Sequence, residues 1–312
     1  MADIIDGRAI AAQLDEVTKA QVDALLADGH PAPGLDVILV GNDPASEVYV
    51  RHKIRACERV GIVSRKHQLP ADTSQDDLLA LIATLNAKPE VHGILCQVPL
   101  PEQIDPALVL GAIAPNKDVD GFHPVNVGRL STGTGGIVPC TPLGVMKLIA
   151  SVVDDLTGKD VVVIGKSNIV GKPVANLLLD AEATVTVTHI YTHGLADICR
   201  QADIIVAAAG APRLVRGHWV KDGAVLIDVG ITRIEGEDGK TKLVGDIAFD
   251  EVQHAAAVTP VPGGVGPMTI ACLLSNTVKA ARVAYGIDKN VGNDFPGGPT
   301  RPMFTGSGSI PN

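Results

Sequence analysis

DVVVIGKSNIVGKPVANLLL, residues 160–179, is the stretch that decides the fold. The run from Val161 to Ile164 consists of β-branched residues and is typical of a strand buried on both faces of a parallel sheet. Gly165 opens a loop after this run, and Pro173 is placed to occupy the first position of a helix. Strand, glycine loop and helix form the first unit of a dinucleotide-binding fold, in which loop and helix amides meet a pyrophosphate. The spacing is not G-x-G-x-x-G, so the same letters also fit an ordinary turn between a strand and a helix.

Further strand-like runs occur on both sides of this unit. They fall at residues 35–40, 62–69 and 93–98 before it, and at 184–188, 204–208, 225–229 and 256–259 after it. Helical stretches separate these runs, and a last helix is expected over 268–283. Strands that alternate with helices through right-handed crossovers predict an α/β protein with a doubly wound parallel sheet.

Composition narrows the class of protein. The 312 residues are enough for about two domains, and 46% hydrophobic residues with 20% charged ones allow large buried sheets. The net charge is −9 without a long basic run, which argues against nucleic acid as a partner. No secretory signal opens the chain, and no apolar run is long enough to cross a membrane. Five scattered cysteines without a C-x-x-C motif favour free thiols in a reducing cytoplasm.

Local signals predict several helix boundaries. Side chains that cap helix N-termini are expected at Asp6, Ser46, Ser74, Asp105 and Thr141. Gly61 is expected to end the helix that Ser46 begins. Residues 115–136 show little periodicity, and a loop of this length inside a compact chain is usually functional or disordered.

A few side chains outside the glycine loop are candidates for chemistry. Tyr49 and Lys53 are four residues apart on a predicted helix and share a face, although a solvated lysine lying on a tyrosine ring is the simpler interpretation. Gln97 lies near the carboxyl end of a predicted strand, where ligands gather, although its amide could merely hold the proline loop that follows. Asp118 and Asp120 belong to a D-x-D-G sequence that lacks the other ligands of a calcium loop, so no metal site is predicted.

Six segments together identify a family. They are YVRHK (49–53), GILCQVPLP (93–101), PNKDVDGFHPVNVGRL (115–130), PCTPLGV (139–145), GKSNIVGKP (165–173) and TPVPGGVGPMT (259–269). Each segment alone is a weak signal. In this order and spacing they closely resemble the bifunctional methylenetetrahydrofolate dehydrogenase/cyclohydrolase family, from about Ile4 to Gly286.

The resemblance implies two α/β domains flanking a cleft, the second a Rossmann-like doubly wound parallel sheet. Residues 1–140 and 268–286 would form the folate-binding domain, and residues 141–267 the NADP-binding domain. Residues 287–312 lie outside the resemblance, and their Gly/Pro/Ser/Asn-rich composition predicts a disordered tail. A cytoplasmic homodimer is implied, which oxidises methylenetetrahydrofolate and hydrolyses the methenyl product to formyltetrahydrofolate. These reactions belong to the one-carbon metabolism that serves purine and amino-acid biosynthesis.

The family's catalytic and folate-binding residues map onto four positions of this chain. The resemblance implies that Tyr49 stacks on the pterin and aminobenzoate rings, that Lys53 moves protons, and that Gln97 holds this lysine in place. Asp120 would accept a pair of N–H donors from the pterin. Asp118 is interpreted instead as a turn-forming residue.

The resemblance also implies a cofactor site and a glycine-rich loop beside it. The cofactor positions are Thr141, Gly165, Lys166, Ser167, Ile190, Gly230 and Ile231, and the loop that approaches nicotinamide and folate contains Pro262, Gly263 and Gly264. Many members have arginine where this chain has Lys166, and serine or arginine where it has Ile190. No carboxylate ends the second strand, as NAD-specific sites usually require, so NADP is predicted. Lys166, His189 and His193 are the nearby cationic candidates, and the two histidines are not predicted to bind metal.

Two other functions fit parts of the sequence. One is a family member with dehydrogenase activity alone, and the other is a non-enzymatic NADP-binding sensor. The presence of Lys53, Gln97 and Asp120 together argues for both activities and against dehydrogenase activity alone. A sensor would have no need for the set Tyr49, Lys53, Gln97 and Asp120.

Overall fold

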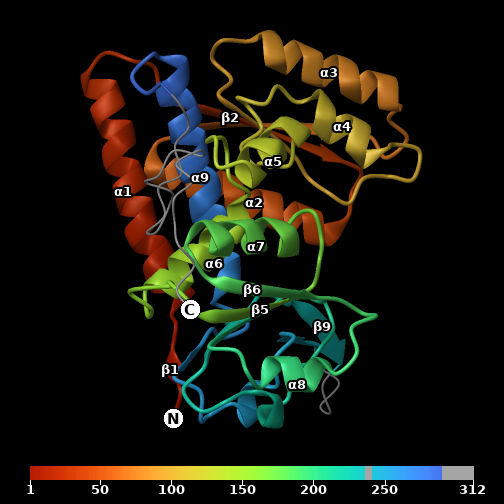
Figure 1. The fold of residues 1–312 in the computed structure, drawn as a ribbon. Coiled ribbons are helices and arrows are strands. Elements are labelled where there is room, and N and C mark those ends of the chain that lie inside the picture. The colour runs from red at the N-terminus through yellow and green to blue at the C-terminus, as the bar shows by residue number, and fades with distance from the viewer. Residues whose placement is uncertain (236–240, 290–312) are drawn as a thin grey trace.

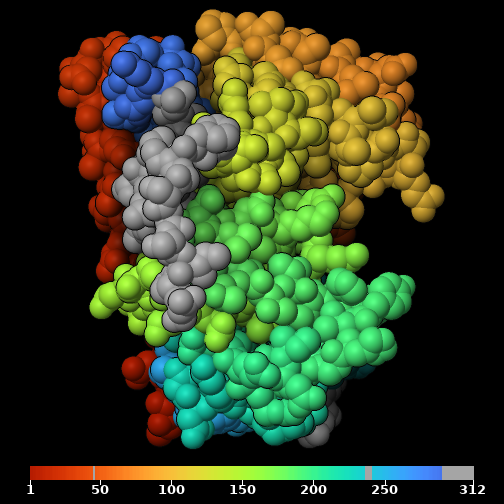
Figure 2. Space-filling view, in the orientation of Figure 1, coloured from red at the N-terminus to blue at the C-terminus, as the bar shows by residue number. Residues whose placement is uncertain are grey.

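A computed structural model describes residues 1–235 and 241–289 of the chain. It contains two α/β units, each built on a parallel sheet, which confirms the predicted fold class (Figure 1). In the space-filling view the first unit forms the upper, orange-to-yellow part of the surface, and the second the green-to-cyan part below it (Figure 2). The predicted disordered tail lies, from residue 290 onward, outside the described residues.

The first unit surrounds a three-stranded sheet with the strand order β3-β2-β4. Its elements are α1 (Gly7–Ala27), β2 (Gly34–Val40), α2 (Pro44–Val60), β3 (Val63–Leu69), α3 (Gln75–Ala87), β4 (Gly93–Cys96), α4 (Pro106–Ala112) and α5 (Pro124–Ser131). Alternate residues of β2 pack into two different hydrophobic cores, one on each face of the sheet. Leu35, Val37 and Leu39 pack with residues of α1 and α2, whereas Ile38 and Val40 pack with residues of α3 and α4.

The second unit surrounds a six-stranded sheet with the strand order β1-β11-β8-β7-β5-β6, in which every neighbouring pair is parallel. Its elements are α6 (Cys140–Ala150), β5 (Asp160–Ile164), α7 (Gly171–Asp180), β6 (Thr184–Thr188), α8 (Leu195–Cys199), β7 (Ile204–Ala207), η1 (Gly217–Trp219), β8 (Val225–Asp228), η2 (Phe249–Glu251) and β11 (Ala257–Val258). An antiparallel hairpin of β9 (Thr232–Glu235) and β10 (Thr241–Val244) was not predicted. The strand order reverses at β5, so the loops beside it lie where ligands bind in such sheets.

The two ends of the chain connect the units. β1 (Asp3–Ile4) pairs with β11 and therefore belongs to the six-stranded sheet. The predicted boundaries, which place the first residues in the folate-binding domain, are wrong for this strand. The last helix, α9 (Val265–Ala284), lies beside α1 and also packs on α6 (Figure 1). Gly7 allows the helix starts to meet, because a Cβ atom there would lie 1.9 Å from the carbonyl oxygen of Gly264. Among the described residues no helix is long and apolar enough to span a membrane.

The helix boundaries confirm some predicted caps and overturn others. Asp6, Ser74 and Asp105 cap α1, α3 and α4 through their side chains, and Gly61 ends α2 in the left-handed conformation. Ser46 was wrong as a cap: Asp43 caps α2 by accepting the amide of Ser46 at 2.7 Å.

Three further helix predictions were wrong. Thr141 is the second residue of α6, which begins at Cys140 without a side-chain cap. Pro173 is the third residue of α7 and not the first. Helix α5 occupies part of the predicted loop 115–136, and His123 caps it by accepting the amide of Val125 at 3.0 Å.

Candidate functional site

Lys53 and Gln97 are joined by a hydrogen bond. Lys53 lies in the third turn of α2 and Gln97 follows directly after β4, and the lysine Nζ donates to Gln97 Oε1 at 3.1 Å. The amide of Gln97 is oriented by its other end, because its Nε2 donates to the carbonyl oxygen of Val98 at 2.7 Å. The backbone at Gln97 is held by Ile38 of the central strand, whose carbonyl oxygen accepts its N–H at 2.9 Å. The lysine head is therefore positioned by the end of the sheet.

Tyr49 lies one turn before Lys53 on the same helix. Its side chain is 46% exposed, although the helix buries Val50 and Cys57 on its core face. An exposed aromatic ring beside an oriented ammonium group offers a flat surface on which a ring system can stack.

The loop that carries Asp120 is held by buried polar contacts. Lys117 donates to the carbonyl oxygens of Leu85, Asn86 and Lys88 and thereby binds the C-terminal end of α3. Asp118 is 1% exposed and accepts from the His123 amide at 2.8 Å and the side chain of Asn126 at 2.9 Å. Burial raises the pKa of Asp118, and these hydrogen bonds lower it. Asp118 thus organises the loop, as its interpretation as a turn-forming residue requires.

Asp120 and Lys53 both act on the thiol of Cys140. Burial raises the pKa of Cys140 well above its ordinary value, and the charge of Asp120 raises it further, whereas the charge of Lys53 lowers it. Cys140 is the first residue of α6, and its thiol donates to the carbonyl oxygen of Val119 at 3.2 Å. The next residue, Thr141, contacts Thr269 of α9 through its hydroxyl at 3.0 Å. The structure therefore brings Lys53, Asp120 and Thr141 to the start of α6.

The glycine-rich loop before α9 is shaped by close contacts. Gly263 has φ +112°, a conformation that residues with side chains rarely adopt. A Cβ atom at Gly264 would lie 2.7 Å from that of Thr259, so the loop folds tightly on itself. Pro262 is exposed at its tip, next to these two buried glycines.

The loop after β5 has the form expected of a phosphate-binding turn but uses its amides differently. Gly165 has φ +119°, and a Cβ atom there would lie 2.2 Å from the carbonyl oxygen of Ala208. Ser167 Oγ accepts the amides of Val170 and Gly171 at 3.1 and 3.3 Å. The amides at the start of α7 are therefore engaged within the chain, and an anion would be met by the exposed loop that contains Lys166.

The other predicted cofactor residues follow neighbouring strands of the same sheet. Gly230 and Ile231 follow β8, and Ile190 follows β6 at the edge of the sheet, where it is 90% exposed. Ile190 offers no polar atom to a phosphate. The ring of His189 is oriented by its Nδ1, which accepts the amide of Tyr191 at 3.2 Å and leaves Nε2 as the ring donor.

Two buried carboxyl groups beside Gly230, those of Asp228 and Asp246, were not predicted. Asp228 is the last residue of β8, and an aspartate at the carboxyl end of a buried strand is a signal that could have revealed it. Across residues 1–235 and 241–289, no group of three or more His, Cys, Asp or Glu side chains is arranged to hold a metal ion.

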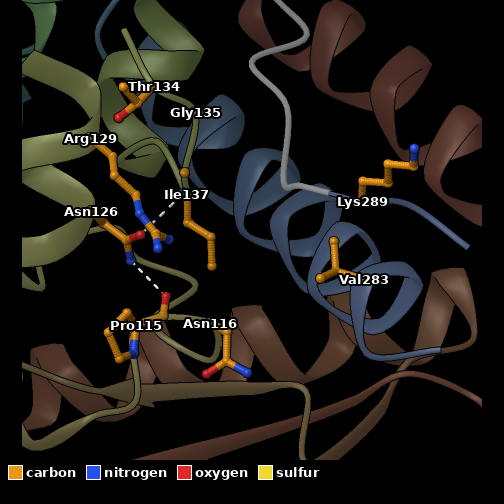
Figure 3. Close-up of a pocket in the computed structure, with 10 residues that line it drawn as sticks. Pro115, Asn116, Asn126, Arg129, Thr134, Gly135, Ile137, Val283 and Lys289 are labelled. Carbon is orange, nitrogen blue, oxygen red and sulfur yellow. Dashed lines mark hydrogen bonds between the residues drawn. The ribbon is translucent and has the colours of Figure 1, made fainter. Parts of the chain in front are cut away.

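A cavity of about 210 Å³ lies apart from these residues, between the loop around Ile137 and the end of α9 (Figure 3). Arg129 and Lys289 contribute the charged groups of its wall. Asn126, on the same wall, donates to the carbonyl oxygen of Pro115 at 2.8 Å and accepts the amide of Ile137 at 3.4 Å. Through Asn126 the cavity wall is connected to the loop that carries Asp120. None of the predicted site residues lines the cavity, so the cavity is not part of the candidate site.

Two family models match the chain. The model described as "Tetrahydrofolate dehydrogenase/cyclohydrolase, catalytic domain" matches residues 5–120, and its "NAD(P)-binding domain" counterpart matches residues 139–285. The "Bifunctional protein FolD 2" of Rhizorhabdus wittichii is 75% identical over 280 residues, which cover 89% of this chain and 94% of that protein.

Solved structures agree with these matches. The bifunctional FolD methylenetetrahydrofolate dehydrogenase/cyclohydrolase of Campylobacter jejuni is 51% identical with a TM-score of 0.87, over 90% of this chain and 99% of that one. The Trypanosoma brucei N5,N10-methylenetetrahydrofolate dehydrogenase-cyclohydrolase, complexed with NADP cofactor and inhibitor, is 42% identical with a TM-score of 0.86, over 91% and 98% of the two chains.

Proposed function

The chain belongs to the tetrahydrofolate dehydrogenase/cyclohydrolase family, and from this premise we propose how its residues carry out two consecutive reactions. It oxidises 5,10-methylenetetrahydrofolate to 5,10-methenyltetrahydrofolate with NADP, and it hydrolyses this product to 10-formyltetrahydrofolate. The observation that carries the assignment of roles is the hydrogen bond between Lys53 and Gln97. A chain with dehydrogenase activity alone would have no need for an oriented lysine.

Hydride transfer needs alignment and no proton. Tyr49 stacks against the folate rings, and Asp120 accepts the N–H donors of the pterin edge. The backbone of Pro262, Gly263 and Gly264 comes close to both reacting rings. The tight folding of this loop supports that assignment. These contacts serve to hold the donor carbon and the acceptor ring within reacting distance.

Hydrolysis needs proton movement at two stages. Water loses a proton as it adds to the methenyl carbon, and the ring nitrogen gains one as its bond to that carbon breaks. Lys53 is the group that we assign to both transfers: as a neutral amine it takes the proton that water loses, and as the resulting ammonium it gives that proton to the ring nitrogen. The amide oxygen of Gln97 orients its Nζ at 3.1 Å. The charges of Asp120 and Lys53 both affect the pKa of the Cys140 thiol, and we assign Asp120 to hold the pterin beside the lysine.

The residues around the loop after β5 fit NADP. Gly165 permits the close approach of loop and strand end, and Lys166 offers an exposed cation to a phosphate. His189 adds a ring N–H at the end of β6, where the side chain of Ile190 adds nothing polar. When bound, NADP accepts the hydride; Thr141, Ser167, Gly230 and Ile231 are proposed to complete its site.

We also propose the larger setting of the enzyme. Apart from β1, which pairs in the six-stranded sheet, residues 1–140 and 268–286 would supply the folate-binding domain and residues 141–267 the cofactor domain, and the two would flank a shared cleft. A homodimer fits the edge strand β6, which has one partner strand among residues 1–235 and 241–289 and exposes 41% of Val187. The proposed location is the cytoplasm, where 10-formyltetrahydrofolate would serve purine and amino-acid biosynthesis.

One assay tests the two reactions together. Purified protein is given methylenetetrahydrofolate with either NAD or NADP, and the absorbances of reduced nicotinamide and of methenyltetrahydrofolate are followed separately. Reduced nicotinamide should form faster with NADP, and the methenyl signal should stay low because hydrolysis removes it. Stoichiometric accumulation of the methenyl compound would instead identify a dehydrogenase alone. The absence of reduction with either cofactor would favour a non-enzymatic sensor.

A further inference from the structure

Two buried aspartates tie together the loops at the carboxyl edge of the six-stranded sheet. Asp228 is 4% exposed, and its Oδ1 accepts the amides of Gly230 at 3.0 Å and of Asp246 at 2.8 Å. Its Oδ2 accepts the amide of Ile247 at 2.9 Å. Its own amide donates to the hydroxyl of Thr259, in the segment that leads to the glycine-rich loop, at 2.7 Å.

Asp246 holds the turn after β7. It is fully buried, and its Oδ2 accepts the amides of Ala209 at 2.7 Å and Gly210 at 2.9 Å. Its Oδ1 is buried without any hydrogen-bond partner. An unpartnered buried carboxylate oxygen is costly, so its presence calls for an explanation beyond stability.

The unpartnered oxygen lies against the loop after β8. A Cβ atom at Gly230 would be 2.3 Å from Asp246 Oδ1, and a Cβ atom at Gly245 would be 1.9 Å from Asp228 Oδ2. The turn that Asp246 holds also contacts the loop after β5, where a Cβ atom at Gly165 would be 2.2 Å from the Ala208 carbonyl oxygen. A continuous line of contacts therefore runs from Gly165 through Ala208 and Asp246 to Gly230.

We propose that Asp246, supported by Asp228, is a positioning residue for hydride transfer, which sets the loop of Gly230 and Ile231 relative to the loop after β5. This inference rests on the proposed function, which assigns both loops to the cofactor. Two loops that bind one extended molecule must keep a fixed separation, and a displacement of about 1 Å can cost about 100-fold in rate. The inference concerns only the reaction that uses the cofactor, because hydrolysis does not.

The electrostatics of the pair support a functional reason for its presence. Burial raises the pKa of Asp228 to about 7, and the charge of Asp246 contributes, whereas amides of Ile247, Asp246 and Gly230 lower it. Burial also raises the pKa of Asp246. Burial of two carboxyl groups costs free energy, and neutral side chains could hold the same turn. The raised pKa values of the pair beside a cofactor loop therefore favour a functional role.

The two activities of one protein make the test decisive. Asp246→Asn keeps one oxygen for the amides of Ala209 and Gly210 but places an N–H donor against Gly230. We expect the dehydrogenase kcat/KM to fall about 10–100-fold with a higher KM for NADP. Hydrolysis of methenyltetrahydrofolate, supplied directly and without cofactor, should stay within about twofold of the unmodified protein. Asp203→Asn, which alters a carboxylate that binds an amide near the opposite end of the sheet, is the control and should change neither activity.

Each outcome supports or overturns the inference. Equal losses in both reactions would show a general structural role, and no loss in either would show that the pair does not position the cofactor. If Asp246→Asn does not fold, Asp228→Asn weakens the same support, because Asp228 accepts the amides of Gly230, Asp246 and Ile247, and it should give the same split between activities. An unmodified protein that lacks both activities would refute the proposed function instead, which separates the two failures.

Discussion

Lys53 and Gln97, 44 residues apart in the sequence, are in direct contact: the lysine Nζ donates to the glutamine Oε1 at 3.1 Å. The acceptor is a neutral amide, so it orients the ammonium group without supplying a counter-charge. Because Gln97 Nε2 is engaged by Val98, the amide cannot turn away without losing a second hydrogen bond. The contact therefore fixes the position of the lysine Nζ, the proposed proton carrier, at the end of β4.

Lys53→Met should separate the two activities. Methionine is similar in length but cannot carry a proton, and a positioned acid–base group typically contributes about 10²–10⁴-fold. We expect cyclohydrolase activity to fall by such a factor and dehydrogenase activity to fall less, because hydride transfer moves no proton. Methenyltetrahydrofolate should then accumulate during turnover and be visible by its absorbance.

Lys66→Met is the matched control for this experiment. Lys66 is an exposed residue of the edge strand β3, and its loss should leave both rates unchanged. Wild-type hydrolysis by the Lys53 variant would mean that Lys53 is a solvated lysine without a role in proton transfer.

Asp120 and Asp118 should respond differently to the same change. In the proposed folate site, Asp120→Asn turns an acceptor into a donor that would face the paired N–H groups of the pterin. Loss of a charged hydrogen bond should weaken folate binding about 10–100-fold and leave NADP affinity unchanged. Asp118→Asn instead disturbs the acceptor for His123 and Asn126, so it should lower the free energy of unfolding by about 1–3 kcal/mol.

Calorimetry with folate and with NADP, combined with denaturant unfolding, distinguishes these effects. Unchanged folate affinity in the Asp120 variant would show that this residue serves the loop alone. The second activity, hydrolysis, should weaken in parallel because it uses the same folate contacts.

Local signals were enough to predict most of the regular elements. The β-branched run that begins at Val161 became the buried strand β5, because buried parallel strands select these residue types. The run from Thr184 became β6, a largely exposed edge strand whose Thr and Val residues favour the extended backbone. β1 was missed because it has two residues and gains its only partner from β11, more than 250 positions away. The cap of α2 was misplaced because Asp43 and Ser46 are both good capping residues and Pro44 favours the earlier start.

The candidate site was predicted less from physics than from resemblance. The spacing of Tyr49 and Lys53 indicates a shared helix face, but no local pattern indicates that Gln97 lies within hydrogen-bond distance. Asp246 gave no signal at all, since its contacts come from the turn after β7 and the end of β8, which are distant from it in the sequence. Contacts of this kind are set by tertiary packing, which short-range periodicity does not encode.

His92 should make stability depend on pH. The side chain is buried, its Nδ1 accepts the amide of Gly34 at 2.9 Å, and its Nε2 has no partner. Burial, with the charges of Lys117 and Arg65, lowers the pKa of His92 to about 4. Between pH 6.5 and 4 the unfolded chain therefore binds a proton that the folded chain does not, so stability is fully present above pH 6.5 and falls as pH decreases through this window.

The size of the His92 effect can be measured by unfolding at several pH values. A shift from 6.5 to about 4 corresponds to a loss of up to about 3 kcal/mol in the free energy of unfolding. His92→Gln should remove this slope, whereas the control His52→Gln, at an exposed position of α2, should retain it. An identical slope in the His92 variant would assign the acid sensitivity to other groups.

Lys166→Ala should narrow the preference for NADP over NAD. Lys166 is exposed in the loop after β5, and Ile190, at the end of the neighbouring strand, offers no polar atom, so the lysine is the main candidate for the 2′-phosphate. Removal of one charged phosphate contact typically costs about 1.5–3 kcal/mol, which corresponds to about a 10–100-fold loss in kcat/KM with NADP and little change with NAD.

Lys159→Ala removes the same charge just before β5, at the opposite end of that strand, and should leave the ratio unchanged. A preference that survives Lys166→Ala would transfer the contact to His189, whose Nδ1 accepts the Tyr191 amide and whose Nε2 is therefore the ring donor. Equal kcat/KM of the unmodified enzyme with NADP and NAD would show that no residue in the loops after β5 and β6 binds the 2′-phosphate.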